Sequence, residues 1–167
     1  MKDEDKQRHY ELAVKLLSEE NFPAAAIAGA VAAVIAVITY GLAVAYADYA
    51  DGFAAAGIGI IVGLSMQFVG RGLSPKFGVL AAAYTIAGCI LGGGFVGVMR
   101  IAVSRGVSPL EIVKSDGLRE LAAMSTRGFS LVDLVYWLVA VFCAVFLARR
   151  PLSRAERLAI GLYRMRR

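Results

Sequence analysis

Long stretches without a charged side chain are the feature that most limits what this chain can fold into. No Asp, Glu, Lys or Arg lies between Asp51 and Arg71, or between Lys76 and Arg100. Each gap approaches the roughly 20 residues that an α-helix needs to cross the ~30 Å hydrocarbon layer of a bilayer. A helix of a soluble domain would instead alternate apolar and polar positions to keep one face in water. The pattern therefore indicates a membrane protein.

Four apolar segments predict the fold class: an all-α, integral membrane four-helix bundle in a single domain. They are residues 23–47, 52–70, 75–99 and 130–148. Hydrophobic residues make up 59% of the chain and charged residues 19%, which fits burial in lipid better than a water-excluded core. A signal peptide is rejected for the first segment, because the segment is too long and a charged stretch precedes it.

The placement of Lys and Arg predicts the orientation. Residues 1–21 carry several Lys and Arg residues, the tail after residue 148 is rich in Arg, and the loop between the second and third segments carries Arg71 and Lys76. This pattern places both termini in the cytoplasm. Residues 100–129 conflict with it, because their five Lys and Arg residues then lie in an outer loop, for which Ser108 to Glu111 predicts a helix start. A half-inserted element in this loop is the alternative.

Amphipathic helices are predicted at both ends of the chain. In residues 1–21, one face at helical spacing carries Tyr10, Ala13, Val14 and Leu17. Residues 152–167 form a basic helix that we expect in the interface of an anionic inner leaflet, with partner docking as the alternative. The residues expected to contact lipid headgroups are Arg149, Arg150, Arg154, Arg157 and Arg164.

Small residues spaced four apart predict how the helices pack, because they let backbones approach closely. These residues are Gly59 and Gly63 in the second segment, and Gly88, Gly92, Gly93 and Gly97 in the third. The fourth segment lacks glycine and is bulky, so we expect it to face lipid or a neighbouring subunit. The tightest contacts are then expected between the second and third segments. A bend of the third segment at its run of three glycines is an alternative.

Few polar groups fall within or near the segments, and they define two candidate features. Asp48, Asp51 and Asp133 are predicted at the outer end, where they would attract cations. The simpler interpretation is that Asp133 caps the fourth segment and pairs with Arg100. The deepest polar residues, which form either interhelical hydrogen bonds or a polar path, are Ser65, Gln67, Tyr84 and Thr85.

No catalytic grouping, phosphate loop, haem ligand pair or metal-ligand spacing can be assembled from this sequence. We therefore predict that the chain is not an enzyme and needs no cofactor or metal. The positive net charge of +5 sits beside the apolar segments, where it sets topology, and does not predict nucleic-acid binding.

The stretch GRGLSPKFGVLAAAYTIAGCILGG, Gly70 to Gly93, resembles a segment of uncharacterised bacterial multi-pass membrane proteins. The shared features are a basic glycine-containing loop, a Phe-Gly start and a Gly-Cys pair before a glycine-rich end. Here they are Arg71, Gly72, Lys76, Phe77, Gly78, Gly88 and Cys89. The resemblance implies a bacterial inner membrane and carries no activity.

These observations favour a self-associating or accessory structural subunit of a membrane assembly. The expected partners are the lipid bilayer and either further copies of the chain or another membrane protein. The alternatives are a homo-oligomeric channel for ions or small solutes, and a small dimeric transporter.

Overall fold

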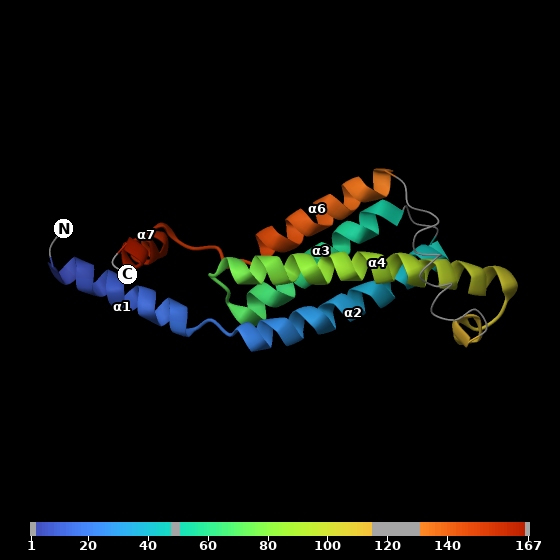
Figure 1. Cartoon of the computed structure of the whole chain (residues 1–167), viewed down its shortest axis with the longest axis horizontal. Coiled ribbons are helices and arrows are strands. Elements are labelled where there is room, and N and C mark those ends of the chain that lie inside the picture. The colour runs from blue at the N-terminus through green and yellow to red at the C-terminus, as the bar shows by residue number, and fades with distance from the viewer. Residues whose placement is uncertain (1–2, 48–50, 115–130, 166–167) are drawn as a thin grey trace.

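The chain folds into a slender, elongated molecule. We describe it from a computed structural model, which gives the backbone of residues 3–47, 51–114 and 131–165 and the side chains of residues 7–43, 55–114, 131–161 and 163. Every regular element in these ranges is an α-helix, which confirms the predicted all-helical fold. Four long helices lie side by side, and a helix from each end of the chain lies beyond one end of them (Figure 1).

The four long helices form a bundle in which successive helices run in opposite directions (Figure 1). They are α2 (Phe22–Ala47), α3 (Asp51–Gly70), α4 (Pro75–Arg105) and α6 (Leu131–Leu147). The helix α4 passes without interruption through its three consecutive glycines. It continues beyond the predicted end at residue 99, because apolar residues 101–103 extend it, and it stops at Gly106 in the left-handed conformation (φ 65°).

Two of these helices are long and apolar enough to cross a membrane, namely α2 over Phe22–Ala43 and α4. The other two contain shorter apolar stretches, Ala55–Gly70 and Leu131–Leu147. Core helices of soluble proteins reach similar length and hydropathy, but they are mostly buried. Here only 22% of the apolar window of α2 and 44% of that of α4 are buried. Most of this apolar surface therefore faces outward.

The helix α6 packs closely against α3, which corrects the expectation that the fourth segment faces lipid or another subunit alone. A Cβ atom built on Gly59 would overlap the backbone of Ala140, at 2.9 Å from its Cα atom. One turn on, a Cβ atom on Gly63 would lie 3.1 Å from the Cα atom of Ala144. Small residues on one face of α6 make this approach possible, since Ala140, Ala144 and Ala148 are fully buried.

The predicted tight contact between the second and third segments is also wrong. The helices α3 and α4 each pack more extensively on α2 and α6 than on each other, whereas α2 and α6 make no contact within the described residues. The helices α3 and α4 therefore touch across the short diagonal of the bundle, with α2 and α6 on either side. The glycines of α4 receive side chains instead of a helix backbone: a Cβ atom on Gly88 would lie 3.1 Å from Ile58, and one on Gly92 would lie 3.0 Å from Tyr40.

The remaining predicted packing glycines of α4 have a different place in the structure. No described atom beyond its own helix lies within 4 Å of a Cβ atom built on Gly93, and Gly97 is half-buried. At this end of α4, residues 109–114 form a helical turn that folds back on it. Ile112 is buried with Val98 and Ala102 of α4. The residues after 114 in this loop, including the predicted helix stop at 116–117, lie outside the described residues.

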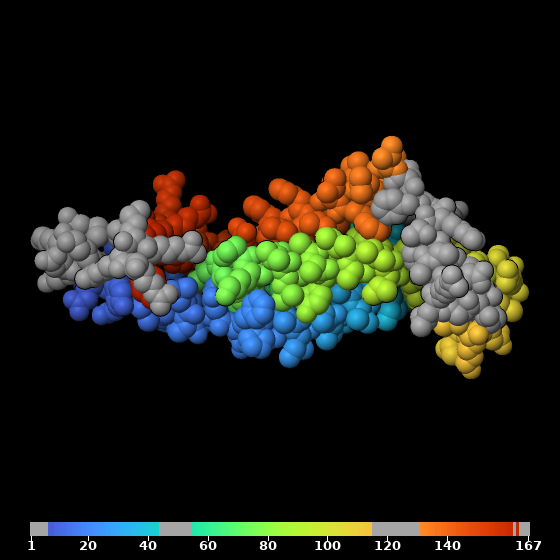
Figure 2. Space-filling model, in the orientation of Figure 1, coloured from blue at the N-terminus to red at the C-terminus, as the bar shows by residue number. Residues whose placement is uncertain are grey.

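The terminal helices α1 (Asp3–Ser18) and α7 (Arg154–Met165) form a separate unit, which we call the arm. They pack on each other through buried Ala13, Leu16 and Ala159, and the rings of Tyr10 and Tyr163 lie 5.4 Å apart. Within the described residues, neither helix packs against a long helix. The arm extends beyond the end of the bundle, where both chain termini lie (Figures 1 and 2).

The contact between α3 and α6 can be tested by substituting a glycine at the contact, with a second glycine of α3 away from the contact as the control. Gly59→Ala is expected to destabilise the protein by about 1–3 kcal/mol, because the added methyl group must push the two backbones apart. Gly57→Ala adds the same group to the same helix at a place where no described atom beyond that helix lies within 4 Å of the new Cβ atom. It is expected to be neutral or stabilising by up to ~1 kcal/mol, from helix propensity. Thermal unfolding in detergent micelles measures both, and equal transitions for the two variants would contradict the packing described.

Candidate functional site

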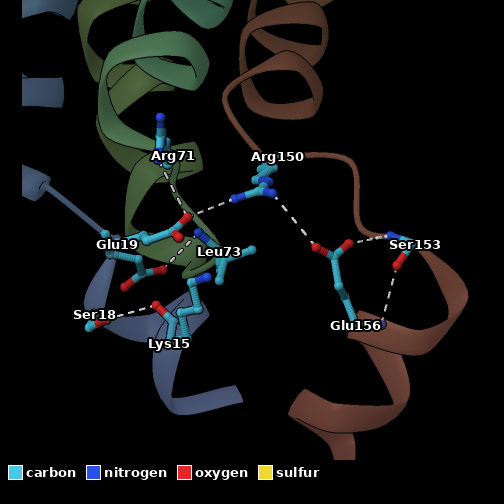
Figure 3. Close-up of polar contacts among 9 residues, drawn as sticks. Lys15, Ser18, Glu19, Arg71, Leu73, Arg150, Ser153 and Glu156 are labelled. Carbon is cyan, nitrogen blue, oxygen red and sulfur yellow. Dashed lines mark hydrogen bonds and ion pairs between the residues drawn. The ribbon is translucent and has the colours of Figure 1, made fainter. Parts of the chain in front are cut away.

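Three connecting segments meet at the end of the bundle that carries the arm. They are the linker between α1 and α2 (residues 19–21), the turn between α3 and α4 (residues 71–74), and the segment from the end of α6 to α7 (residues 148–153). We call this meeting point the junction (Figure 3). Each segment is distant from the others in sequence, so the junction is a tertiary feature.

Backbone hydrogen bonds attach both outer segments to the turn. The N–H of Asn21 donates to the carbonyl oxygen of Gly70 at 3.1 Å, and the N–H of Arg150 donates to that of Gly72 at 3.0 Å. The side chain of Asn21 also accepts from the N–H of Ala24 at 3.0 Å, which caps the start of α2. The turn between α3 and α4 is thus the common support of the entry to α2 and the exit from α6.

A carboxylate from the linker completes the turn. The Oε1 atom of Glu20 accepts hydrogen bonds from the N–H groups of Leu73 and Ser74, each at 2.7 Å. Ser74 occupies the N-cap position of α4 but makes no side-chain capping bond. Glu20 therefore satisfies backbone donors at this helix start that no helical partner reaches, with the short distances typical of charge-assisted bonds.

The conformation of the turn depends on Arg71 and Gly72. Arg71 closes α3 in the left-handed region (φ 47°), and its N–H donates to Gln67 at 3.1 Å. For a residue with a side chain this conformation costs roughly 1–2 kcal/mol. Gly72 lies directly against the ring of Phe77, and this ring meets that of Phe22 edge-on at 5.5 Å. A side chain at residue 72 would displace the aromatic ring.

Arg150 links two carboxylates across the junction. Its Nη1 atom lies 3.2 Å from Oε2 of Glu19, and its Nη2 atom lies 3.6 Å from Oε1 of Glu156 (Figure 3). Glu19 also pairs with Arg71 at 3.5 Å, but that arginine is 59% exposed, so the pair contributes little. The side chains of Arg150 and Glu19 are 34% and 29% exposed, which shelters their contact. Arg150 thereby joins the base of α1 to the base of α7.

Glu156 also forms a capping box with Ser153 at the start of α7. Its carboxylate accepts from the N–H of Ser153 at 2.7 Å, and the hydroxyl of Ser153 accepts from the N–H of Glu156 at 3.3 Å. The backbone hydrogen bond from Ser153 is the main cause that lowers the pKa of Glu156, followed by the Ser153 side chain and the charge of Arg150. The ionised carboxylate of Glu156 is therefore the form that stabilises the start of α7.

The predicted headgroup cations separate into two kinds. Arg149, Arg154 and Arg157 are exposed, whereas Arg150 is engaged in the junction. Arg164 lies in α7, and its side chain lies outside the described residues. Sequence reasoning treated all five as equivalent, although neighbouring Arg149 and Arg150 have different surroundings.

The residues of the predicted polar path occupy different faces. Ser65 and Gln67 are half-buried and lie two positions apart on α3, which turns them to opposite sides of the helix. The ring of Tyr84 lies beside Gly29 of α2. Thr85 is fully buried, and its hydroxyl has no hydrogen-bond partner in the part of the chain described.

Of the three predicted outer acids, Asp51 and Asp133 lie at the end of the bundle opposite the arm. Asp133 is in the first turn of α6 and is half-buried. Asp51 begins α3 at the same end, but its side chain is not among those described, and Asp48 lies outside the described residues (Figure 1). No group of three His, Cys, Asp or Glu residues that could hold a metal ion occurs within the described ranges.

Glu19 and Glu20 are the functional residues that sequence reasoning missed. A signal was present, since two consecutive acids directly before the first apolar segment stand close in topology to the basic turn at Arg71. Only the folded chain shows that one acid binds arginines and the other binds backbone N–H groups.

Comparisons with known proteins do not assign this chain to a family. No family model, no curated protein and no solved structure matches this chain.

The role of Arg150 can be tested against the arginine beside it. Arg150→Gln is expected to speed amide hydrogen exchange in α1 and α7 by about fivefold, since a partly sheltered ion pair is worth about 1 kcal/mol. Exchange in the bundle helices is expected to stay unchanged. Arg149→Gln removes the same charge without breaking an ion pair of the junction, so it should leave the arm as protected as in the wild type. Equal effects of the two substitutions would rule out the assigned link.

Acidification is expected to loosen α7. Because the pKa of Glu156 is lowered by folding, its contribution is complete at neutral pH and is lost as the pH falls through that lowered pKa. Protection of α7 amides, corrected for intrinsic exchange, should therefore fall as the pH drops below the ordinary range of a Glu carboxyl. Glu156→Gln should be less protected at neutral pH and show a flatter profile. Glu111→Gln alters the other capping box, with Ser108, and should leave the α7 profile unchanged.

Proposed function

We propose that this chain is a multi-pass membrane protein whose four long helices cross a bacterial inner membrane with both termini in the cytoplasm. Its proposed role is that of a structural subunit, self-associating or accessory, in a membrane assembly. In this role, the arm is the part of the chain that binds the partner.

Exposed apolar side chains support the membrane placement. The outward faces of α2, α4 and α6 carry large hydrophobic residues that are mostly accessible, including Ile27 (67%), Leu91 (65%) and Phe142 (71%). In the space-filling view, α6 lies along the edge of the bundle with its outer side chains clear of the other helices (Figure 2). An apolar surface of this extent is favourable in lipid and unfavourable in water.

The arm is the observation that carries the proposed role. It adds no packing to the bundle, yet the junction holds it in place with ion pairs and backbone hydrogen bonds. The helix α7 covers only part of the apolar face of α1. Tyr10, Val14 and Leu17, which share a stripe at helical spacing, remain 36–44% exposed. A held and partly apolar helix pair beyond the bundle is suited to binding another polypeptide.

The native mass of the full-length protein in lipid nanodiscs tests this role. We expect a defined homo-oligomer or a complex with a co-purifying membrane polypeptide. The double substitution Val14→Ser and Leu17→Ser removes the aliphatic part of the exposed stripe and leaves buried Ala13 and Leu16 and the contact between Tyr10 and Tyr163 in place. It is expected to reduce the mass to that of the single chain.

A control substitutes the polar face of the same helix. Glu11→Gln with Lys15→Gln should preserve the assembly, because these exposed residues lie away from the stripe. A wild-type protein that is monomeric in lipid, without a companion, would disprove the proposed role. A wild-type protein absent from the membrane fraction would disprove the membrane placement.

A further inference from the structure

We propose that residues 109–114, which we call the return turn, lie in the surface layer of the bilayer at the end opposite the arm, with Leu110 and Val113 inserted among the lipids. The inference rests on the membrane placement proposed above. It goes beyond that placement, because it assigns a lipid contact to a segment that does not cross the membrane. The partner of this surface is the lipid bilayer.

The chain reverses its direction just before the return turn. Gly106, in the left-handed conformation, ends α4. Ser108 and Glu111 then form a capping box: the N–H of Ser108 donates to the carboxylate of Glu111 at 3.3 Å, and the hydroxyl of Ser108 accepts from the N–H of Glu111 at 3.3 Å. The return turn therefore lies back toward the bundle from the end of α4 (Figure 1).

The return turn packs on the outward face of α4. Ile112 is 3% exposed and is buried together with Val98 and Ala102. Leu91, Val98 and Ala102 follow one another at intervals of seven and four residues, so they lie on one face of the helix. Leu91 is 65% exposed, which shows that this face points away from the bundle. The return turn thus covers the same face of α4 that lipid covers two turns earlier.

This contact sets the depth of the return turn in the bilayer. Arg100 is the first charged residue after the uncharged stretch 77–99. A cation in this position marks the level at which hydrocarbon gives way to headgroups. Val98 precedes Arg100 by two residues and Ala102 follows it by two. Ile112, which is buried between them, is therefore held at the level of the headgroups.

The side of the return turn that faces away from α4 is apolar. Leu110 is 68% exposed and Val113 is 40% exposed. Leu110 is two positions from Ile112, which turns it to the opposite side of the helical turn. At the level of Arg100, an outward apolar side chain meets the boundary between headgroups and acyl chains. Its burial there is favourable, because it removes apolar surface from water.

Cations border this apolar surface. Lys114 follows Leu110 by four residues, and Arg105 follows Ala102 by three residues on α4, so each lies on the side of its neighbour. Both cations are exposed. A short apolar surface bordered by Lys and Arg is typical of helical segments that lie in a membrane surface, where the cations meet lipid phosphates.

Tryptophan fluorescence of the full-length protein in vesicles tests this position. The chain carries a single tryptophan, Trp137, which Trp137→Phe removes. In that background, Leu110→Trp is reconstituted in phosphatidylcholine with a minor fraction of phosphatidylglycerol. Lipids brominated at the headgroup end of their acyl chains should quench it several times more strongly than Ser104→Trp. Ser104 is an exposed residue of α4 beyond the level of Arg100, and aqueous acrylamide should quench its tryptophan instead.

A tryptophan in the middle of α4 separates this inference from the membrane placement. Leu91→Trp should be quenched by lipids brominated deep in their acyl chains. If Leu91→Trp is quenched while Leu110→Trp behaves like Ser104→Trp, the inference is overturned and the placement stands. If Leu91→Trp is not quenched either, both are overturned. Shielding of Leu110→Trp from brominated lipid and from acrylamide would also overturn the inference, and would assign the surface to a polypeptide.

A matched pair of serine substitutions tests whether the contact with α4 sets the depth. Ile112→Ser, combined with Leu110→Trp, should lose most of the quenching by brominated lipid, because the return turn is no longer held on α4. Val103→Ser removes a 51% exposed apolar side chain from the same end of α4, outside this contact, and should leave the quenching unchanged. Equal quenching in the two variants would rule out the assigned role of Ile112.

Discussion

The turn between α3 and α4 leaves backbone groups that neither helix can satisfy, and their hydrogen bonds organise one whole end of the molecule. The carbonyl groups of Gly70 and Gly72 accept N–H bonds from the linker before α2 and from the segment after α6. The N–H groups of Leu73 and Ser74 bind the carboxylate of Glu20. Unsatisfied polar groups of this kind are costly wherever water is excluded, so the turn holds its partners firmly. These hydrogen bonds fix the position of the two segments that lead into the arm.

At the same end of the molecule, the neighbouring residues Arg149 and Arg150 have different surroundings. Arg150 is turned into the junction, where Glu19 and Glu156 neutralise it and connect the bases of α1 and α7. Its neighbour Arg149 lies over Gly78 on the outside of the bundle and keeps its charge exposed. One residue along the chain thus separates a cation that fixes internal geometry from a cation available to the surroundings.

The sequence predicted the helices well and their contacts poorly. Uncharged stretches of ~20 residues indicate long helices whatever surrounds them, and the described helices lie where these stretches are. The fourth segment was placed outside the tight contacts because it lacks glycine and is bulky, which overlooked Ala140 and Ala144 as the surface that receives Gly59 and Gly63. In the bundle α3 and α4 touch across the short diagonal through Ile58, and each packs more extensively on α2 and α6.

The candidate site shows the same division between local and long-range information. Capping boxes such as Ser153 with Glu156 depend on residues three positions apart, so they are legible in the sequence. The pairing of Glu19 with Arg150 joins residues 131 positions apart, and no local pattern specifies it. By itself, the sequence determined the helical class, the extent of the apolar segments and the cationic character of one end, because each follows from side-chain type and spacing along the chain. Only the tertiary structure decided which helices touch, which arginine is neutralised and where the arm stands, because these depend on close approach between groups that are distant in the chain.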